Sequence, residues 1–325
     1  MSAEVTILGA GVAGLTVAHE LAGRGVALRI IDPAGGPGPE GCSWWAGGML
    51  APYCEGETAE ESVVRLGGDA ADWWRAAGAE VTRAGTLVLA LGRDRSELDR
   101  FARRTRGHRR LSAEALDGLE PALAGRFTGA LHLPREAHLD PRAALTTLRR
   151  GLAARGLAIE RDATPAPTGG TVIDCRGLAA RDRLPGLRGV RGEMAILRAP
   201  DPALRRVVRL LHPRHPLYLV PRGDGIYMLG ATQIESDGRG PPSLRSVAEL
   251  LNAVYALHPA FAEAEVLEIG ADARPAFADN LPRIVREGDR IHVNGLFRHG
   301  FLLAPALARM VAGLLLDGKQ PELMQ

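Results

Sequence analysis

Residues 5–14 read Val-Thr-Ile-Leu-Gly-Ala-Gly-Val-Ala-Gly, and residues 28–32 read Leu-Arg-Ile-Ile-Asp. The two stretches predict a strand, a glycine turn, a helix and a second strand that ends in an acid. Gly9 allows the tight turn, Gly11 lets backbone N–H groups approach a pyrophosphate, and Gly14 lets the helix pack closely on the sheet. Asp32 stands where a carboxylate can accept hydrogen bonds from ribose hydroxyls. The pattern predicts a dinucleotide-binding unit on a parallel sheet, with the phosphates at the helix N-terminus.

Length and composition place the chain among ordinary globular proteins. It has 325 residues, 46% apolar and 24% charged, which suffices for one large or two interlocked domains. No apolar run reaches the roughly 18 residues that a membrane span needs, so we expect no span. The first strand begins almost at once and leaves no room for a signal peptide, so we expect a cytoplasmic protein.

Cysteine, lysine and arginine usage argues against several kinds of chemistry. The three cysteines, Cys42, Cys54 and Cys175, are an odd number at unrelated spacings, which predicts neither a disulfide framework nor a metal site. Lys319 is the single lysine and lies in the tail, which effectively excludes Schiff-base catalysis. The formal charge of +2 gives no reason to expect nucleic acid. The arginine-rich segment 93–110 also carries acids, as a solvated helix face does.

Pattern changes along the chain predict two interleaved domains. The stretch 42–52, Cys-Ser-Trp-Trp-Ala-Gly-Gly-Met-Leu-Ala-Pro, suits close approach of the backbone to a flat ligand, although a tight turn before a helix explains it equally well. Asp140-Pro141 indicates a helix start, and residues 222–225 indicate the turn of an antiparallel hairpin. The expected helices are 59–78, 141–155, 246–257 and 302–316; the expected strands are 85–91, 158–160, 171–174, 215–220, 226–229, 266–269 and 291–294, with a Pro/Gly loop between 160 and 171.

The expected fold is α/β, with a Rossmann-like parallel-sheet domain interleaved with an α+β domain whose sheet is antiparallel. Residues 1–83, 135–183 and 270–325 are assigned to the first domain. Residues 84–134 and 184–269 are assigned to the second. The C-terminal strand, turn and helix offer one more helix N-terminus to the cofactor. An NAD site does not need this element, whereas a flavin gains from it, because a helix N-terminus stabilises the negative charge that develops on reduction.

A series of short motifs runs along nearly the whole chain. They are Gly9–Gly14, Ala46–Pro52, His138–Pro141, Gly192–Met194, Tyr218–Arg222, Gly230–Thr232, Ala273–Pro275 and Phe297–Pro305. The last is the most specific. Together they resemble the D-amino-acid-oxidase superfamily of FAD enzymes, and within it the glycine oxidases of thiamine biosynthesis. The resemblance implies that the first domain binds FAD and that the second binds the substrate.

The resemblance also implies a noncovalent FAD and a set of site residues. Tyr218, Arg274 and Arg298 would grip the substrate, because a guanidinium binds a carboxylate through two parallel N–H···O bonds and a phenol adds a third. A covalent flavin link through Cys42 or Cys54 is the alternative. The cofactor-binding residues implied are Gly9, Gly11, Val12, Ala13, Gly14, Asp32, Ser43, Gly47, Gly48, Met49, Gly177, Arg298, His299, Gly300, Phe301 and Leu302. No essential acid, base or metal ligand is implied.

The activity implied is the oxidation of glycine or another small amino acid or amine. Hydride passes from the substrate Cα to flavin N5, the imine hydrolyses to the oxo acid, and O₂ is reduced to H₂O₂. The resemblance suggests that the protein is a homotetramer and that its reaction supplies the synthesis of the thiamine thiazole. The alternatives are an FAD-dependent D-amino-acid dehydrogenase with a quinone or carrier acceptor, a noncatalytic flavin-binding protein, and a nicotinamide-dependent reductase.

Departures from the family pattern concern substrate choice. His299 stands where asparagine is common, and it either tunes substrate choice and pH dependence or is a loop histidine bonded to backbone. Trp44 and Trp45 replace small residues, which leaves the pocket size open. The lysine and cysteine of the sarcosine-oxidase branch have no counterparts in the C-terminal part. An Arg298→Ala change is expected to weaken carboxylate binding by about 2–5 kcal/mol if the charge is buried.

Overall fold

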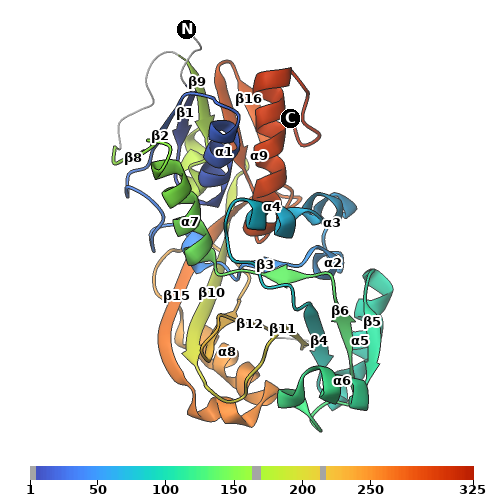
Figure 1. Ribbon diagram of the computed structural model, residues 1–325. Helices are drawn as coiled ribbons and strands as arrows, with labels where there is room; N and C mark the ends of the chain where they lie inside the picture. Colours follow the sequence, from blue (N-terminus) through green and yellow to red (C-terminus); the bar gives the residue numbers. More distant parts are fainter. Residues whose placement is uncertain (1–4, 163–169, 213–216) are drawn as a thin grey trace.

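Two sheets at opposite ends of the molecule form the framework of the computed structural model, which describes residues 5–162, 170–212 and 217–325 (Figure 1). One sheet has six strands and the other has nine, and a two-stranded ribbon lies between them. Five strands of the first sheet run parallel, while the second sheet is mainly antiparallel. The predicted fold class is therefore confirmed.

The six-stranded sheet is built around the strand that precedes the glycine turn. β1 (Val5–Leu8) lies between β2 (Leu28–Ile31) and β9 (Thr171–Asp174) and is parallel to both. All four residues of β1 are buried, as expected for a parallel strand covered on both faces. The full order is β16 (Arg283–Glu287), β17 (Arg290–Asn294), β9, β1, β2 and β8 (Ile159–Glu160). The predicted return of the chain to this sheet at 171–174 is confirmed.

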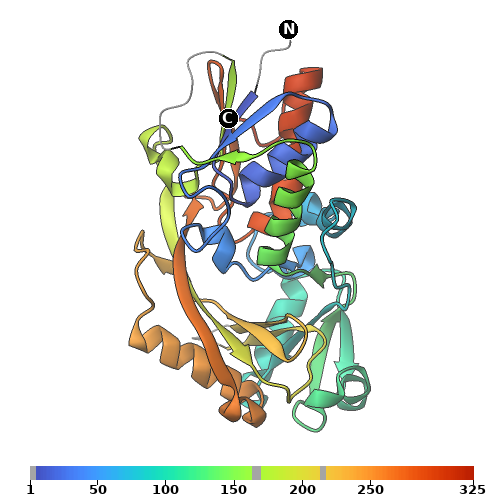
Figure 2. The same cartoon turned by 60° about the vertical axis from the view of Figure 1, so that its left-hand side comes forward.

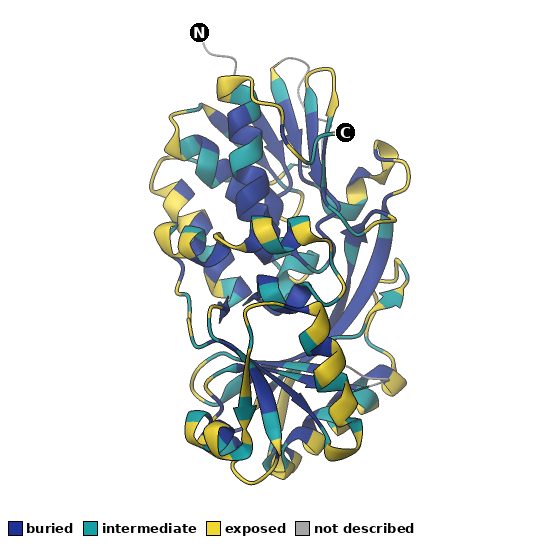
Figure 3. Ribbon diagram, turned by 90° about the vertical axis from the view of Figure 1, so that its right-hand side faces the viewer, coloured by how far each residue is buried: buried dark blue, intermediate teal, exposed yellow. Residues whose placement is uncertain are grey.

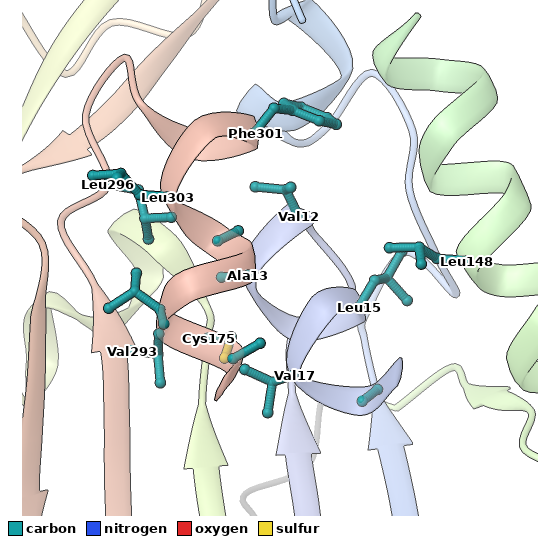
Figure 4. Close-up of a cluster of buried hydrophobic side chains, with 14 of the residues drawn as sticks. Val12, Ala13, Leu15, Val17, Leu148, Cys175, Val293, Leu296, Phe301 and Leu303 are labelled. Carbon is teal, nitrogen blue, oxygen red and sulfur yellow. The ribbon is translucent and has the colours of Figure 1, made fainter. Parts of the chain in front are cut away.

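Three helices pack side by side next to this sheet (Figures 1 and 4). α1 (Val12–Gly23) lies between α7 (Pro141–Ala153) and α9 (Gly300–Asp317). Leu15 of α1 meets Leu148 of α7, and their packing forms part of the main buried core. Helix α7 starts as predicted, because the Asp140 carboxylate accepts hydrogen bonds from the first two free N–H groups of the helix, at 2.7 and 3.0 Å.

The first turn of α9 is anchored by a tryptophan. Pro305 has no N–H to donate to the carbonyl of Phe301, four residues earlier. The indole Nε1 of Trp74 donates to that carbonyl instead, at 2.8 Å, and the two rings stack with centroids 5.4 Å apart. Trp74 belongs to α4 (Ala70–Ala76) and is fully buried. The start of α9 is thereby held against α4.

Among the described residues, α9 is the helix long and apolar enough to cross a membrane by length and composition. It has 18 residues with a mean hydropathy of 1.6, and 61% of this stretch is buried inside the protein. Figure 3 shows it among the dark, buried parts of the molecule. A helix with apolar neighbours on most sides is itself apolar, so burial accounts for this composition.

The nine-stranded sheet contains the hairpin that the turn residues predict. β12 (Leu217–Pro221) and β13 (Ile226–Gly230) pair antiparallel, with Tyr218 opposite Gly230. His215 and Pro216 of the predicted first strand lie outside the described residues, as does most of the predicted loop between 160 and 171. The sheet order is β14 (Ile234–Glu235), β10 (Arg188–Arg198), β13, β12, β11 (Val207–Leu211), β4 (Thr86–Ala90), β6 (Gly129–Leu133) and β5 (Arg109–Ser112), with β15 (Glu265–Ala276) also beside β10.

The helix predicted over 59–78 is wrong in extent. The segment forms α3 (Glu61–Gly67) and α4, with a break after two consecutive glycines, which are the poorest helix formers apart from proline. A side chain at Gly67 would lie 2.7 Å from Leu302, so the glycine also makes room for α9.

The strand predicted at 266–269 is only the start of a much longer one. β15 runs to Ala276 and pairs with β10 along almost its whole length, which a local pattern cannot reveal. Figure 2 shows β15, in orange, rising from the lower sheet towards the upper one. It therefore passes through the domain limit predicted at residue 270, and the domain limits remain predictions.

The remaining elements include a helix that matches its predicted environment. The arginines of α5 are exposed while Phe101 is buried, so the predicted solvated helix face is confirmed. The elements not yet described include the ribbon strands β3 (Met49–Leu50) and β7 (Ala137–His138). They also include the helices α2 (Pro52–Glu55), α5 (Arg95–Arg104), α6 (Ala113–Leu119) and α8 (Leu244–Leu257). Short 3-10 helices lie at Cys42–Trp45, Gly92–Asp94, Pro121–Leu123, Gly177–Asp182 and Pro259–Glu263.

Candidate active site

A cavity of about 820 Å³ extends from the glycine turn to the residues of the nine-stranded sheet. It is lined by segments from all parts of the chain, which the fold brings together. Its lining includes Gly9, Gly11, Val12, Ala13, Asp32, Ser43, Gly47, Gly48, Met49, Gly177, Tyr218, Arg274, Arg298, His299, Gly300, Phe301 and Leu302. Gly14 is the one predicted site residue that does not line it.

The glycine turn has no room for side chains. Gly9 has a φ of +94°, and a Cβ there would lie 2.7 Å from the Cys175 carbonyl oxygen. A Cβ at Gly14 would lie 1.8 Å from the carbonyl oxygen of Gly9. Gly14 thus lies behind the turn, where its lack of a side chain lets α1 start close to the sheet. One carboxylate oxygen of Asp32 accepts from the N–H of Ala10 at 2.7 Å, which ties the end of β2 to the turn.

The N-terminus of α1 is capped from outside the helix. Its N-cap residue, Gly11, has no side chain, and the hydroxyl of Ser43 accepts from the N–H of Val12 at 3.0 Å. The starts of both α1 and α9 border the cavity. Two helix N-termini therefore offer positive potential and N–H groups to an anionic ligand.

A buried arginine holds the small-residue loop at 46–48. Arg222 donates to the carbonyl of Gly47 at 2.9 Å, to that of Ala46 at 3.3 Å, and to that of Leu139. Burial lowers the pKa of Arg222 to about 10, so it stays charged at neutral pH. Arg222 thus fixes the backbone that faces the cavity next to Tyr218.

Trp44 and Trp45 do not line the cavity. The guanidinium of Arg142 lies over both rings, 4.4 and 5.4 Å from their centroids, and binds Glu268 at 2.7 Å. A side chain at Gly270 would lie 1.9 Å from the Trp45 ring, so β15 leaves room for this ring through a glycine. The tryptophan pair joins the loop to α7 and β15.

The three predicted substrate residues meet at the end of the cavity towards the nine-stranded sheet. The charges of Arg274 and Arg298 both act on the phenol of Tyr218. Arg298 is already bound: its Nε donates to Glu55 Oε2 at 2.8 Å, and a terminal nitrogen donates to Thr58 at 2.7 Å. Arg274 makes one long contact, 3.4 Å, to the carbonyl of Thr232, and no carboxylate of the described residues pairs with it.

Burial and charge set the protonation states at this end. Burial raises the pKa of Tyr218, so its phenol is protonated and can donate. Burial also lowers the pKa of His299 to about 4, which leaves the imidazole neutral at pH 7. Burial alone would raise the pKa of Glu55, but the positive charges around it, Arg298 foremost, lower that pKa to about 2. Glu55 is thus an ionised, buried carboxylate.

Sequence reasoning missed three residues of this end. Glu55 lies on α2, Arg209 on β11 lines the cavity near it, and Arg222 holds the loop. Arg222 was within a quoted motif, but the motif assigns it no role. Glu55 is one of several acids after Pro52, and only the path of α2 and α3 decides which of them points inward. Within the described residues, no group of three or more His, Cys, Asp or Glu side chains could hold a metal.

Glu136 should make the stability of the protein depend on pH. It is fully buried, its Oε1 accepts from the N–H of Cys54 at 2.7 Å, and burial raises its pKa to about 7. Because the folded pKa lies above the unfolded one, its stabilising contribution is present below about pH 4.5 and is lost as pH rises through about 7. Glu136→Gln cannot ionise, so its stability relative to wild type should improve by up to about 3 kcal/mol between pH 5 and pH 8.

Urea unfolding at the two pH values measures this difference. The exposed Glu114→Gln is the matched control and should show no such improvement. A Glu136→Gln variant whose stability relative to wild type is the same at both pH values would contradict the assignment.

Comparison with known proteins agrees with this geometry. The family model described as FAD dependent oxidoreductase (DAO) matches residues 4–314. A Rhizobium etli protein named "Putative thiamine biosynthesis oxidoreductase ThiO" is 56% identical over 98% of this chain and 98% of its own length. Glycine oxidase of Bacillus licheniformis is 26% identical over 96% of this chain and 93% of its own. The crystal structure of iminodiacetate oxidase from Chelativorans sp. BNC1 is 25% identical, with a TM-score of 0.81 over 98% of this chain and 96% of that one.

A match over nearly the whole chain and a glycine turn that opens onto a long cavity lead to the same conclusion. The chain belongs to the DAO family of FAD-dependent oxidoreductases.

Proposed function

We propose that the protein oxidises glycine or another small amino acid, with O₂ as electron acceptor. The observation that carries the proposal is the unpaired guanidinium of Arg274 beside the protonated phenol of Tyr218, in the same cavity as the glycine turn. A planar guanidinium and a phenol form a binding site for a carboxylate. The names of the Rhizobium etli and Bacillus licheniformis relatives support a role in thiamine biosynthesis and glycine as a substrate, respectively.

FAD fits the cavity on the evidence of this chain alone. The volume lies in the upper part of the range of roughly 300–1,000 Å³ for small-molecule sites, and the N-termini of α1 and α9, which suit anionic groups, both border the cavity. Gly9, Gly11 and Asp32 would hold the ADP part, and Gly47, Met49 and the start of α9 would border the flavin. When bound, FAD supplies the acceptor for the hydride that leaves the substrate Cα.

The binding of FAD is proposed to be noncovalent. Burial raises the pKa of Cys42 to about 12 and the pKa of Cys54 well above its usual value. Both thiols are therefore protonated at neutral pH, and the thiolate is the form that attacks an electrophile. A cytoplasmic location and assembly into a homo-oligomer remain predictions from the sequence and its family resemblance.

The chain's own residues orient the substrate. Arg274 would bind the carboxylate through two parallel N–H···O bonds, and Tyr218 would donate a third hydrogen bond. Together they would fix the position of Cα relative to the loop at 46–48, which Arg222 holds in place. No residue is assigned as an acid or base. Amino acid, O₂ and water would give oxo acid, ammonia and H₂O₂.

Gly192 should be essential to the position of Arg274. A Cβ at Gly192 would lie 1.9 Å from a terminal nitrogen of Arg274, so Gly192→Ala must displace the guanidinium. Because the displaced atoms are the end of a flexible side chain, we expect a small change in Tm but a KM for glycine raised by about 10- to 100-fold. Steady-state kinetics and thermal unfolding check this. Gly118→Ala, with open space around the glycine, is the control, and an unchanged KM in Gly192→Ala would overturn the assignment.

An anaerobic absorbance titration tests the function. The purified holoenzyme is titrated separately with glycine, sarcosine, D-alanine and NADH, and air is then readmitted. Bleaching of the flavin followed by fast return of colour with H₂O₂ and ammonia supports the proposal. Bleaching without fast reoxidation by air indicates a dehydrogenase, bleaching by NADH alone indicates a reductase, and no bleaching by any of these indicates a noncatalytic flavoprotein; each of these three results contradicts the proposal.

A further inference from the structure

We propose that Glu55 restricts the site to amino acids with a single carboxylate, by occupying the second arginine of the substrate end. The inference rests on the proposed function, because it takes the substrate to be an amino acid whose carboxylate binds Arg274. It concerns the ion pair between Arg298 and Glu55. Of the two arginines predicted to bind substrate, this pair leaves only Arg274 without a carboxylate partner among the described residues.

The bond between Glu55 and Arg298 is built into the fold. Arg298 follows β17 and precedes α9, whereas Glu55 ends α2, more than two hundred residues away in sequence. Glu55 is 8% exposed and Arg298 makes a further hydrogen bond to Thr58, so both partners are held on the same side of the cavity. Separating a buried carboxylate from its guanidinium partner is strongly unfavourable, because an uncompensated charge is then left buried.

The other charged groups near Glu55 do not supply a second free cation. Arg209 lines the cavity but binds Glu57 at 2.7 Å, and the Glu57 carboxylate is 9% exposed. His299 lies 3.5 Å from Glu55 through its Nδ1 and is neutral at pH 7. Of the arginines that act on Tyr218, Arg222 is used by backbone carbonyls. Among these arginines, Arg274 is left for the ligand. Arg245 of α8 also lines the cavity, but it is an exposed residue.

A ligand with two carboxylates meets an ionised Glu55 where its second carboxylate would seek Arg298. It must then either displace Glu55 from Arg298 or place a second negative charge beside it without a partner. Both of these outcomes cost free energy. A ligand with a single carboxylate bound to Arg274 avoids this cost. An oxidase with this pairing therefore favours monocarboxylates such as glycine over dicarboxylates such as iminodiacetate.

Calorimetric titration of the holoenzyme with acetate and with malonate tests the inference without turnover. Glu55→Gln removes the charge but keeps the shape. We expect malonate to bind this variant about 10- to 100-fold more tightly than wild type, with acetate changed by less than about threefold. Glu61→Gln removes an exposed carboxylate from the adjacent helix and should change neither affinity. Restoring the wild-type affinities in Glu55→Gln/Arg298→Gln would show that Arg298 is the second anchor.

Two results would overturn the inference. Malonate carries two negative charges and acetate carries one. If the factor by which Glu55→Gln increases the affinity for malonate is no greater than the square of the factor for acetate, Glu55 acts only through the general electrostatic potential of the cavity. If neither ligand's affinity changes, Glu55 does not control Arg298. Because these ligands are not oxidised, a failure of the inference can be distinguished from a failure of the proposed function. Acetate binding that is lost in Arg274→Ala, together with no bleaching by amino acids, would refute the oxidase and not the binding rule. A kcat/KM ratio for iminodiacetate over glycine that rises in Glu55→Gln would support both.

Discussion

Replacing Arg274 with alanine is expected to raise the KM for glycine by about 30-fold to several thousand-fold, the equivalent of about 2–5 kcal/mol for removing one partner of a desolvated charge pair. Arg274 is the one guanidinium among the substrate residues that no described carboxylate pairs with, so its charge is available to the ligand. Steady-state kinetics with glycine, and calorimetric titration with acetate, measure the effect. Bound FAD should remain.

Arg274→Lys is the informative companion variant. It keeps the charge but loses the planar fork that binds a carboxylate through two bonds, so its KM should fall between those of wild type and Arg274→Ala. Arg298→Ala is no longer expected to have the larger effect, because Arg298 is already bound to Glu55 and Thr58. A KM that changes strongly in Arg298→Ala but not in Arg274→Ala would reverse this assignment of the carboxylate anchor.

Replacing Gly14 with alanine is expected to abolish FAD binding and to lower stability by about 1–3 kcal/mol or more. In most helices this change is favourable, since alanine is the better helix former by about 1 kcal/mol. Here the new Cβ would lie 1.8 Å from the carbonyl oxygen of Gly9, a backbone atom that cannot move without distorting the turn. The variant should purify without the yellow colour of the flavin, and its thermal unfolding midpoint should be lower.

Gly151→Ala provides the matched control for the Gly14 variant. Gly151 lies inside α7, with open space around the position of a Cβ and an ordinary backbone conformation. That change should leave FAD content unchanged and raise stability by about 0.5–1 kcal/mol. A Gly14→Ala protein with full FAD content and an unchanged unfolding midpoint would show that the turn yields, which would contradict the role given to Gly14.

The sequence by itself predicted the elements whose signals are local. The glycine spacing predicted the turn, because only glycine tolerates a φ of +94° with a carbonyl oxygen so close. Asp140-Pro141 predicted the start of α7, and residues 222–225 predicted the hairpin, because capping and turn chemistry act over a few residues. The length of β15 was missed because its partner, β10, sets it from far along the chain.

The predicted site residues other than Gly14 line one cavity, and their roles there remain predictions. What the sequence could not determine is how the charged side chains pair. Arg274 and Arg298 read alike as sequence, and the acids at 55, 57, 60 and 61 read alike too. Only the folded chain brings Glu55 to Arg298 and leaves Arg274 without a carboxylate, because ion pairs form between side chains that the backbone places within a few ångströms of each other, whatever their separation in sequence.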